Sequence, residues 1–189
     1  MPIRVPVTDL DLDLIETQAQ TRHQQMHGQP TSYGRSTPDM QRVGLLGEHA
    51  VATWLKANGH PPRWIDDPDQ WGGTSGQTAY DLSFISEPGK RTHVPTTIEV
   101  KTNRYSDWFT WGRSISAKQL ARTQAHTFTW CVVADDLPTT SVILMGWCPT
   151  QAILDGASHQ PGPTRVVATE PLREMPSLLR YSGWQLRRH

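Results

Sequence analysis

The segment at residues 96–102 alternates charged and β-branched side chains, and this pattern constrains the fold more than any other feature. It reads Thr-Thr-Ile-Glu-Val-Lys-Thr, with Glu99 and Lys101 two residues apart. Successive side chains of a β-strand point to opposite faces of the sheet. Glu99 and Lys101 therefore share one face, and Ile98 and Val100 share the other. The pattern predicts a strand with one apolar face and one face that carries an acid and a cation.

A second strand is predicted at residues 79–86, where large apolar residues alternate with Asp81 and smaller side chains. A turn containing Pro-Gly is predicted at residues 87–90, between this segment and the strand at residues 96–102. The two strands are therefore expected to form a β-hairpin with a somewhat long connection. In that hairpin Asp81 joins the acid and the lysine of the neighbouring strand.

Two carboxylates on neighbouring strands suit Mg²⁺, which binds oxygen ligands and usually takes only one or two protein carboxylates. Asp81 and Glu99 are the expected ligands, and the backbone carbonyl of Val100 is a further candidate. Mn²⁺ is expected to substitute. A metal held here would polarise a scissile phosphate and lower the pKa of an attacking water. Lys101 is expected to position or deprotonate that water, or to stabilise the charged phosphate.

Glu48 is a third candidate acid, on a helix predicted to begin at Pro38 with Thr37 as its N-cap. Gly44 and Gly47 precede this acid and are poor helix formers. Their small size is expected to let the helix approach the sheet closely, which would bring Glu48 toward the metal. The alternative for Glu48 alone is an ordinary solvated helix residue.

The predicted elements follow the order helix, strand, strand, strand, helix, strand, strand. This order indicates an α/β or α+β layered domain with a mixed sheet. The further predicted elements are a helix at residues 8–26 capped by Thr8 or Asp9, strands at 63–65, 127–134, 141–147 and 164–169, a short strand or loop at 107–113, and helices at 114–125, 150–157 and 172–179.

The chain divides by composition into an extension and one domain. Residues 1–37 differ from the remainder and are expected to form an N-terminal extension that is part helical. Residues 38–189 are expected to form a single domain, with a core at about 39–147 and C-terminal additions at 148–189.

Charge and cysteine content narrow the class of protein. The 18 basic and 18 acidic residues cancel, so any contact with nucleic acid must come from local basic patches. Cys131 and Cys148 belong to no ligand cluster and are expected to be buried thiols, with a disulfide or zinc site as the lesser alternative. No segment has the length of a membrane-spanning helix or the pattern of a signal peptide, so we expect a cytoplasmic protein without membrane contact.

Asp81, then Glu99-Val100-Lys101 on the next strand, and Glu48 on a preceding helix together resemble the PD-(D/E)XK nuclease superfamily. The resemblance covers about residues 39–147. It implies a restriction-endonuclease-like αβββαβ core, in which a central mixed sheet is flanked by helices. Tyr80 stands where a proline often precedes the first acid, a common departure.

The resemblance assigns roles to individual residues. Asp81 and Glu99 match the two motif acids, Lys101 matches the motif lysine, and Glu48 matches the supporting acid on the helix. Gln119, with Lys118 as a second choice, matches a polar residue on the helix after the lysine strand. The implied activity is Mg²⁺-dependent hydrolysis of DNA that leaves a 5′-phosphate and a 3′-hydroxyl.

A basic and aromatic stretch after the lysine strand is the most credible surface for DNA. Cationic side chains hold phosphates, and aromatic rings stack on exposed bases. The candidate DNA-binding residues are Arg104, Trp108, Trp111, Arg113, Lys118, Gln119 and Arg122. The alternative for each tryptophan is a place in the core or in a partner interface. The glycine-rich loop at residues 71–76 either closes over substrate or is a linker.

Several alternatives to a DNA endonuclease stay open. A Glu-Val-Lys tripeptide alone is a weak signal, and a solvent-facing hairpin with an ion pair would produce the same letters. A non-catalytic DNA- or protein-binding subunit on the same fold is the main alternative function, and a structure-specific or RNA-directed nuclease is another. A chain this small has little room for a recognition domain, so cutting both strands of DNA is expected to need a homodimer or a partner protein. A restriction, phage or mobile-element context fits such an enzyme.

Overall fold

The structure is a computed structural model, and it describes most of the chain. The described residues are 1–25, 30–31, 34–35, 37–64, 80–85, 95–135, 139–156 and 165–181. The predicted turn at residues 87–90 and the glycine-rich loop at residues 71–76 lie outside them.

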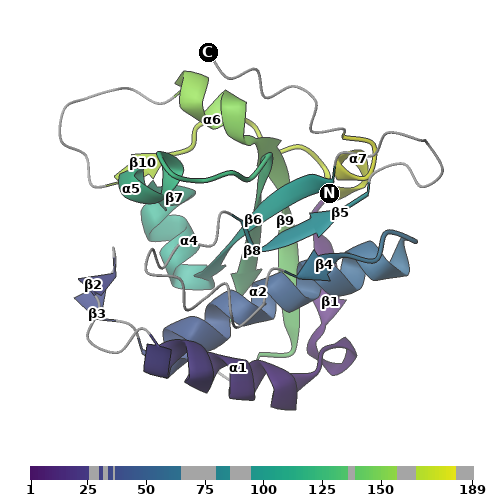
Figure 1. Cartoon of the computed structure of the whole chain (residues 1–189), viewed down its shortest axis with the longest axis vertical. Helices are drawn as coiled ribbons and strands as arrows, with labels where there is room; N and C mark the ends of the chain where they lie inside the picture. Colours follow the sequence, from purple (N-terminus) through teal and green to yellow (C-terminus); the bar gives the residue numbers. More distant parts are fainter. Residues whose placement is uncertain are drawn as a thin grey trace.

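A six-stranded mixed sheet forms the centre of the fold, with the strand order β1-β9-β8-β6-β5-β4 (Figure 1). Strands β6 and β8 run parallel, and every other neighbouring pair is antiparallel. The strands are β1 (Ile3–Pro6), β4 (Arg63–Trp64), β5 (Leu82–Phe84), β6 (Thr96–Arg104), β8 (Thr127–Val133) and β9 (Ser141–Pro149). The predicted α/β class with a mixed sheet is confirmed, and so is the β5–β6 hairpin.

Helices cover both faces of this sheet. Helices α1 (Leu12–Gln25) and α2 (Pro38–Ala57) lie side by side on one face (Figure 1). The other face is covered by α4 (Tyr105–Trp111), α5 (Ala117–Leu120), α6 (Thr150–Gly156) and the two-stranded sheet of β7 (Ser114–Ser116) and β10 (Arg165–Val167). The smaller elements are η1 (Val7–Asp9), β2 (Pro30–Thr31), β3 (Gly34–Arg35) and α7 (Met175–Leu178).

Helix α2 begins and ends as its sequence predicts. The hydroxyl of Thr37 accepts a hydrogen bond from the backbone N–H of Met40 at 3.2 Å, and Pro38 occupies the first turn. At the other end Asn58 caps the helix, and Gly59 adopts a φ of 81°, a left-handed conformation that glycine tolerates best.

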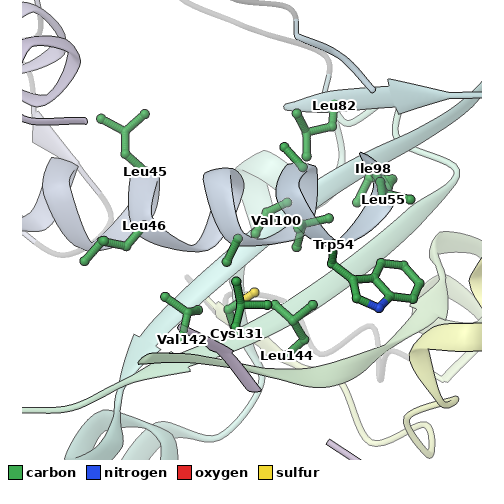
Figure 2. Packing of buried hydrophobic residues seen from close by; sticks show 14 of the residues in the cluster. Leu45, Leu46, Trp54, Leu55, Leu82, Ile98, Val100, Cys131, Val142 and Leu144 are labelled. Carbon is green, nitrogen blue, oxygen red and sulfur yellow. The ribbon is translucent and has the colours of Figure 1, made fainter. Parts of the chain in front are cut away.

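The main hydrophobic core lies between α2 and the sheet. Figure 2 shows Leu45 and Leu55 of α2 with Ile98 and Val100 of β6 and Leu144 of β9, all buried. Because these β6 residues alternate with Glu99 and Lys101, the strand turns its apolar side chains to α2 and its charged pair to the opposite face. The alternation predicted at residues 96–102 is therefore confirmed.

Gly47 brings α2 unusually close to β6. A Cβ atom at Gly47 would lie 1.9 Å from the Thr102 hydroxyl oxygen, so no larger residue fits without a shift. The same hydroxyl donates to the carbonyl of Gly44 at 3.3 Å, whereas a Cβ at Gly44 would meet nothing within 4 Å. The predicted close approach of α2 to β6 therefore depends on Gly47, which has no side chain, and not on Gly44.

A second hydrophobic cluster lies on the opposite face, where Phe128 and Trp130 of β8 meet Ile115 and Ile153. Cys148 belongs to this cluster, and Cys131 belongs to the main core. Both are buried free thiols, as predicted. Burial raises the pKa of Cys148 to about 12, so the thiol stays protonated at neutral pH.

The predicted strand or loop at residues 107–113 is wrong, because this segment lies mostly in helix α4. The backbone N–H and the hydroxyl of Ser106 both donate to the Asp135 carboxylate, at 2.9 and 2.6 Å. This contact satisfies a backbone donor of the first turn from a residue far away in the sequence. Gly112, at a φ of 57°, ends the helix.

The helix predicted at residues 114–125 is also partly wrong. Its first three residues form β7, which pairs with β10, and only Ala117–Leu120 are helical. Ile115 lies opposite Val166 in this pairing and is buried. A partner strand some 50 residues later decides the conformation here, and local propensity does not reveal it.

The N-terminal residues join the main sheet and the main core. Strand β1, which the sequence does not predict, pairs with β9, and Ile15 and Ala19 of α1 are buried in the core. Helix α1 starts at Leu12, later than predicted, because Asp11 caps it by accepting from the N–H of Leu14 at 3.0 Å. Thr8 and Asp9 lie in η1 and do not cap this helix.

The short elements after β9 differ from prediction mainly in length. The helix predicted at residues 172–179 shrinks to one turn, α7, because Arg173 forms two backbone hydrogen bonds with Trp147. Strand β10 and helix α6 fall where they are predicted. No helix in the described residues is long and apolar enough to cross a membrane.

Candidate active site

Strand β6 presents an ion pair on the face turned away from α2. The ammonium of Lys101 lies 2.6 Å from Oε1 of Glu99, and the Glu99 residue is only 4% exposed. Helix α5 adds a third group, because the side-chain amide of Gln119 donates to the same Oε1. Lys101 and Gln119 together hold the Glu99 carboxylate in one position. Oε2 of Glu99 has no hydrogen-bond partner among the described residues.

Asp81 meets β6 directly, although it lies just before β5 and outside the strand in which it is predicted. Its N–H donates to the carbonyl of Ile98 at 2.9 Å, and its Oδ2 accepts from the N–H of Val100 at 2.6 Å. The carboxylate thus replaces the backbone acceptor that a longer β5 would supply. The antiparallel register pairs Leu82 with Ile98, so one further step places Asp81 opposite Glu99.

The carbonyl of Val100 points toward the same place. A strand residue directs its N–H and its C=O to the same neighbouring strand. Because the Val100 N–H binds Asp81 on the β5 side, its carbonyl faces that side too. In chain order β5 begins at Leu82, so within the described residues no strand residue pairs with Val100 on this side. We call this place beside Val100 on β6, next to Asp81 and Glu99, the β6 gap.

Negative charge accumulates at the β6 gap. The pKa of Asp81 is raised well above its usual range, first by burial and then by the negative charges of Glu99 and Glu48. The Lys101 ammonium and the Val100 N–H oppose this rise without cancelling it. The site therefore lacks positive charge when all its carboxylates are ionised.

Glu48 contributes charge to the site from α2, but its oxygen atoms are already bound. Oε1 and Oε2 accept from the two terminal nitrogens of Arg22 at 2.7 and 2.8 Å. Both side chains are buried, and the pair joins α1 to α2. The sequence does not predict this contact, because nothing in the composition of α1 links Arg22 to an acid 26 residues later.

The donor atoms at the β6 gap fit a hard divalent cation. Asp81 and Glu99 supply carboxylate oxygens, and Val100 supplies a carbonyl oxygen. Within the described part of the chain, no three His, Cys, Asp or Glu side chains gather to hold a metal. Mg²⁺ needs no such group, since it commonly binds one or two protein carboxylates and keeps several waters. The excess negative charge around Asp81 also favours a cation.

Some of the predicted DNA-binding residues are exposed beside this site. Trp111 at the end of α4 is 55% exposed, and Lys118 and Arg122 lie exposed on and just after α5. Gln119 lies between these two cations and contacts Glu99, so α5 connects a basic surface to the site.

Other predicted DNA-binding residues serve the fold instead. Arg104 donates to the Asp39 carboxylate at 2.6 Å and to the backbone carbonyl of Asp135. Arg113 donates to a backbone carbonyl and lies over the ring of a buried tryptophan. Trp108 packs against the second hydrophobic cluster. These three side chains are structural in this conformation.

Sequence reasoning missed Tyr105, an exposed aromatic residue on α4 that pairs with Phe109. Tyr105 and Phe109 form an edge-to-face pair with ring centroids 4.8 Å apart, and Phe109 is 70% exposed. Their i,i+4 spacing would have placed them on one helix face, but only if this segment had been predicted as a helix.

Comparison of the chain with models of protein families, with curated proteins and with solved structures finds no match. The function proposed for this chain therefore rests on its own residues and their geometry.

Proposed function

We propose that this protein is a Mg²⁺-dependent DNA endonuclease whose active site is the β6 gap. The observation that carries the proposal is the arrangement of Asp81 and Glu99 on either side of this gap, with Lys101 beside them. A solvent-facing hairpin with an ion pair would leave these groups exposed. Here the Glu99 residue is 4% exposed, and burial raises the pKa of Asp81.

Each side chain has a role that its contacts support. Asp81 and Glu99, with the carbonyl of Val100, would hold the cation, which supplies polarisation of the phosphate and activation of water. Gln119 and Lys101 keep the Glu99 carboxylate in place through Oε1. Lys101 also offers a positive charge to the phosphate as negative charge develops on it.

The order of elements supports the same proposal. Helix α2, the antiparallel strands β4, β5 and β6, helix α5 and the parallel strand β8 occur in the αβββαβ order that the sequence resemblance implies, with α4 and β7 inserted between β6 and α5. The motif residues lie on the second and third of these strands or directly before them. Cutting both strands of a duplex would need two copies of this site, so we further propose a homodimer or a partner protein.

A non-catalytic nucleic-acid-binding subunit is the second candidate. The bidentate contact of Glu48 with Arg22 favours it, because this carboxylate is engaged in the present conformation. A binding subunit would keep the exposed cations Lys118 and Arg122 and would not depend on Asp81.

A plasmid cleavage assay in Mg²⁺ separates these candidates. We expect nicked or linear DNA from the wild type and a loss of about 10²–10⁴-fold in rate for Lys101→Met, the usual contribution of a positioned acid or base. Glu16→Gln is the matched control, because this carboxylate lies on α1 and pairs with Arg42 away from the site. Cleavage that survives both Asp81→Asn and Lys101→Met would refute the assignment of the site. If neither the wild type nor any variant cleaves DNA, the binding subunit is favoured.

A further inference from the structure

A cleft of about 230 Å³ opens next to the β6 gap, between the first half of α2 on one side and the end of β6 with α4 on the other. Lys101 lines it together with Trp111, and Val43 and Gly44 line it from α2. The side-chain amide of Asn103, which also lines the cleft, donates to the carbonyl of Gly112 at 2.9 Å and holds the end of α4 against β6. The cleft therefore shares a residue with the proposed active site.

The lining of the cleft combines a flat aromatic ring, a small apolar wall and polar groups. Trp111 is 55% exposed and Met40 is 36% exposed, so both side chains present surface at the cleft. A Cβ at Gly44 would meet nothing within 4 Å, which leaves open space on the α2 side. Thr102 and Asn103 supply polar atoms along β6. A nucleobase, flat and apolar on its faces and polar at its edges, has the matching chemistry.

The small volume of the cleft favours a single unpaired base as its occupant. Its volume is below the roughly 300–1,000 Å³ of a typical small-molecule pocket, so it has room for one flat group. A base inside a duplex is stacked on both faces and reaches such a pocket only by leaving the stack. A base in a single strand is free to stack on an aromatic side chain.

We infer that this cleft holds one unpaired base of a DNA strand, stacked on Trp111, beside the phosphate that Lys101 faces. The inference rests on the proposed function and refines its substrate class to single-stranded or locally melted DNA. Lys101 then links the two parts, because it lines the base cleft and contacts Glu99 in the active site.

The test measures binding separately from cleavage. A fluorescently labelled single-stranded DNA 12-mer, the same sequence as a duplex, and the same sequence as RNA are titrated with the full chain carrying Asp81→Asn, which prevents cleavage. Binding is read from fluorescence anisotropy. In this background we expect Trp111→Ala to weaken binding of the single-stranded DNA by about 5- to 150-fold, the loss that corresponds to one stacked base. Trp111→Phe should retain most of the affinity.

Two further variants show that the cleft itself is occupied. Gly44→Leu places a side chain in the open space of the cleft while Trp111 stays intact, and it should weaken binding as Trp111→Ala does. Phe109→Ala removes a more exposed aromatic ring of the same helix that does not line the cleft, and it should leave binding unchanged. Thermal melts of each variant confirm that it is folded.

Three results would overturn the inference: equal affinity of Trp111→Ala and its parent, an equal loss for Phe109→Ala, or binding of the duplex or the RNA as tight as that of the single-stranded DNA. Each of them leaves intact a cleavage activity that depends on Asp81. Conversely, binding that depends on Trp111 in a protein that cleaves no DNA would refute the proposed hydrolysis and support the base cleft.

Discussion

Asp81 shows at the scale of one residue how a proposed active site differs from a structural ion pair. Its carboxylate is partly buried near Glu99 and Glu48, and its pKa is raised well above its usual range. Lys101 already contacts Glu99, and Arg22 already binds Glu48. An ionised Asp81 therefore costs the folded state free energy unless a cation joins it.

Asp81→Asn should stabilise the metal-free protein at neutral pH by about 0.5–2 kcal/mol. The amide oxygen still accepts from the Val100 N–H, and the unfavourable charge is gone. Because the folded pKa of Asp81 lies above its unfolded value, its contribution to stability is full below about pH 4 and is lost as pH rises through the folded pKa. The gain from the substitution should therefore grow with pH.

Urea denaturation in EDTA at several pH values measures this gain. Glu16→Gln, which neutralises an exposed carboxylate on α1, is the control and should show no such growth. A free energy of unfolding that is lower for Asp81→Asn than for the wild type at every pH would contradict this description of the site.

His126, at the start of β8, makes a second pH-dependent contribution to the stability of the fold. Its Nδ1 accepts from the Thr97 N–H at 3.0 Å and lies 2.7 Å from the Thr97 hydroxyl, and burial lowers the pKa of His126. The folded pKa thus lies below the unfolded value of about 6.5, so stability present above that pH is lost as pH falls through the folded pKa. His126→Asn keeps an acceptor without a charge and should flatten the acid side of the stability profile.

The control for His126 is His60→Asn. Nδ1 of His60 lies 2.9 Å from the carbonyl of Ile85 and must donate to it, so this ring makes no acceptor contact of the kind that His126 makes. Urea midpoints between pH 5 and pH 8 compare the variants. If stability falls at acid pH as much in His126→Asn as in the wild type, the titration of other groups causes that loss.

Contacts between elements decide where the site residues stand. Helix α2 packs directly on β6 because residue 47 has no side chain. This contact sets the depth at which α2, and with it Glu48, lies over the sheet. The two glycines of this helix can therefore be distinguished by experiment.

Gly47→Ala should destabilise the protein by about 1–3 kcal/mol, because its Cβ would overlap the Thr102 hydroxyl and disturb the contact with Gly44. Gly44→Ala should instead be neutral or stabilising by up to about 1 kcal/mol, since alanine favours the helix and meets nothing. Thermal or urea unfolding gives both values. The opposite order of stabilities would show that α2 does not lie this close to β6.

The contact between α1 and α2 depends on the buried pair of Arg22 and Glu48. Arg22→Met should destabilise the fold by about 3–5 kcal/mol, because it leaves the Glu48 carboxylate buried without its partner. Glu48→Gln in the same protein should recover part of this loss. A double-mutant cycle from urea denaturation measures the coupling. Additive effects of the two changes would mean that the two side chains do not act as a pair.

The sequence predicts elements well where a single periodicity governs them. The α2 cap at Thr37 and the alternation around Glu99 depend on neighbouring residues, and both are confirmed. Helix α4 and strand β7 are not predicted, because Asp135 and Val166 come from distant segments and decide the local structure. Local patterns cannot report partners that only the folded chain brings together.

The same distinction holds for the candidate site. The strand pattern predicts that Asp81, Glu99 and Lys101 come together on adjacent strands. The structure brings them together, but Asp81 lies just before β5 and not within it. The pattern does not predict that the Asp81 carboxylate takes the place of a β5 backbone acceptor for the N–H of Val100. Nor does it predict that Arg22 takes both oxygens of Glu48.

At the scale of the whole molecule, the two covered faces of the main sheet carry different groups. The α1–α2 face holds the main hydrophobic core, and the opposite face carries Glu99 and Lys101 beside the second cluster. The α5 surface with Lys118 and Arg122 and the cleft beside Trp111 lie next to that charged pair. We propose that these groups together hold a nucleic-acid strand while its phosphate meets the β6 gap.

The proposed hydrolysis depends on a divalent cation at the β6 gap, so metal binding tests the central claim most directly. The free Mn²⁺ signal in electron paramagnetic resonance reports how much ion the protein binds as it is titrated. We expect one saturable Mn²⁺ site per chain that Mg²⁺ displaces. The site should be lost in Asp81→Asn and in Glu99→Gln and kept in Glu16→Gln. Unchanged Mn²⁺ binding in the first two variants, or none in the wild type, would contradict the claim.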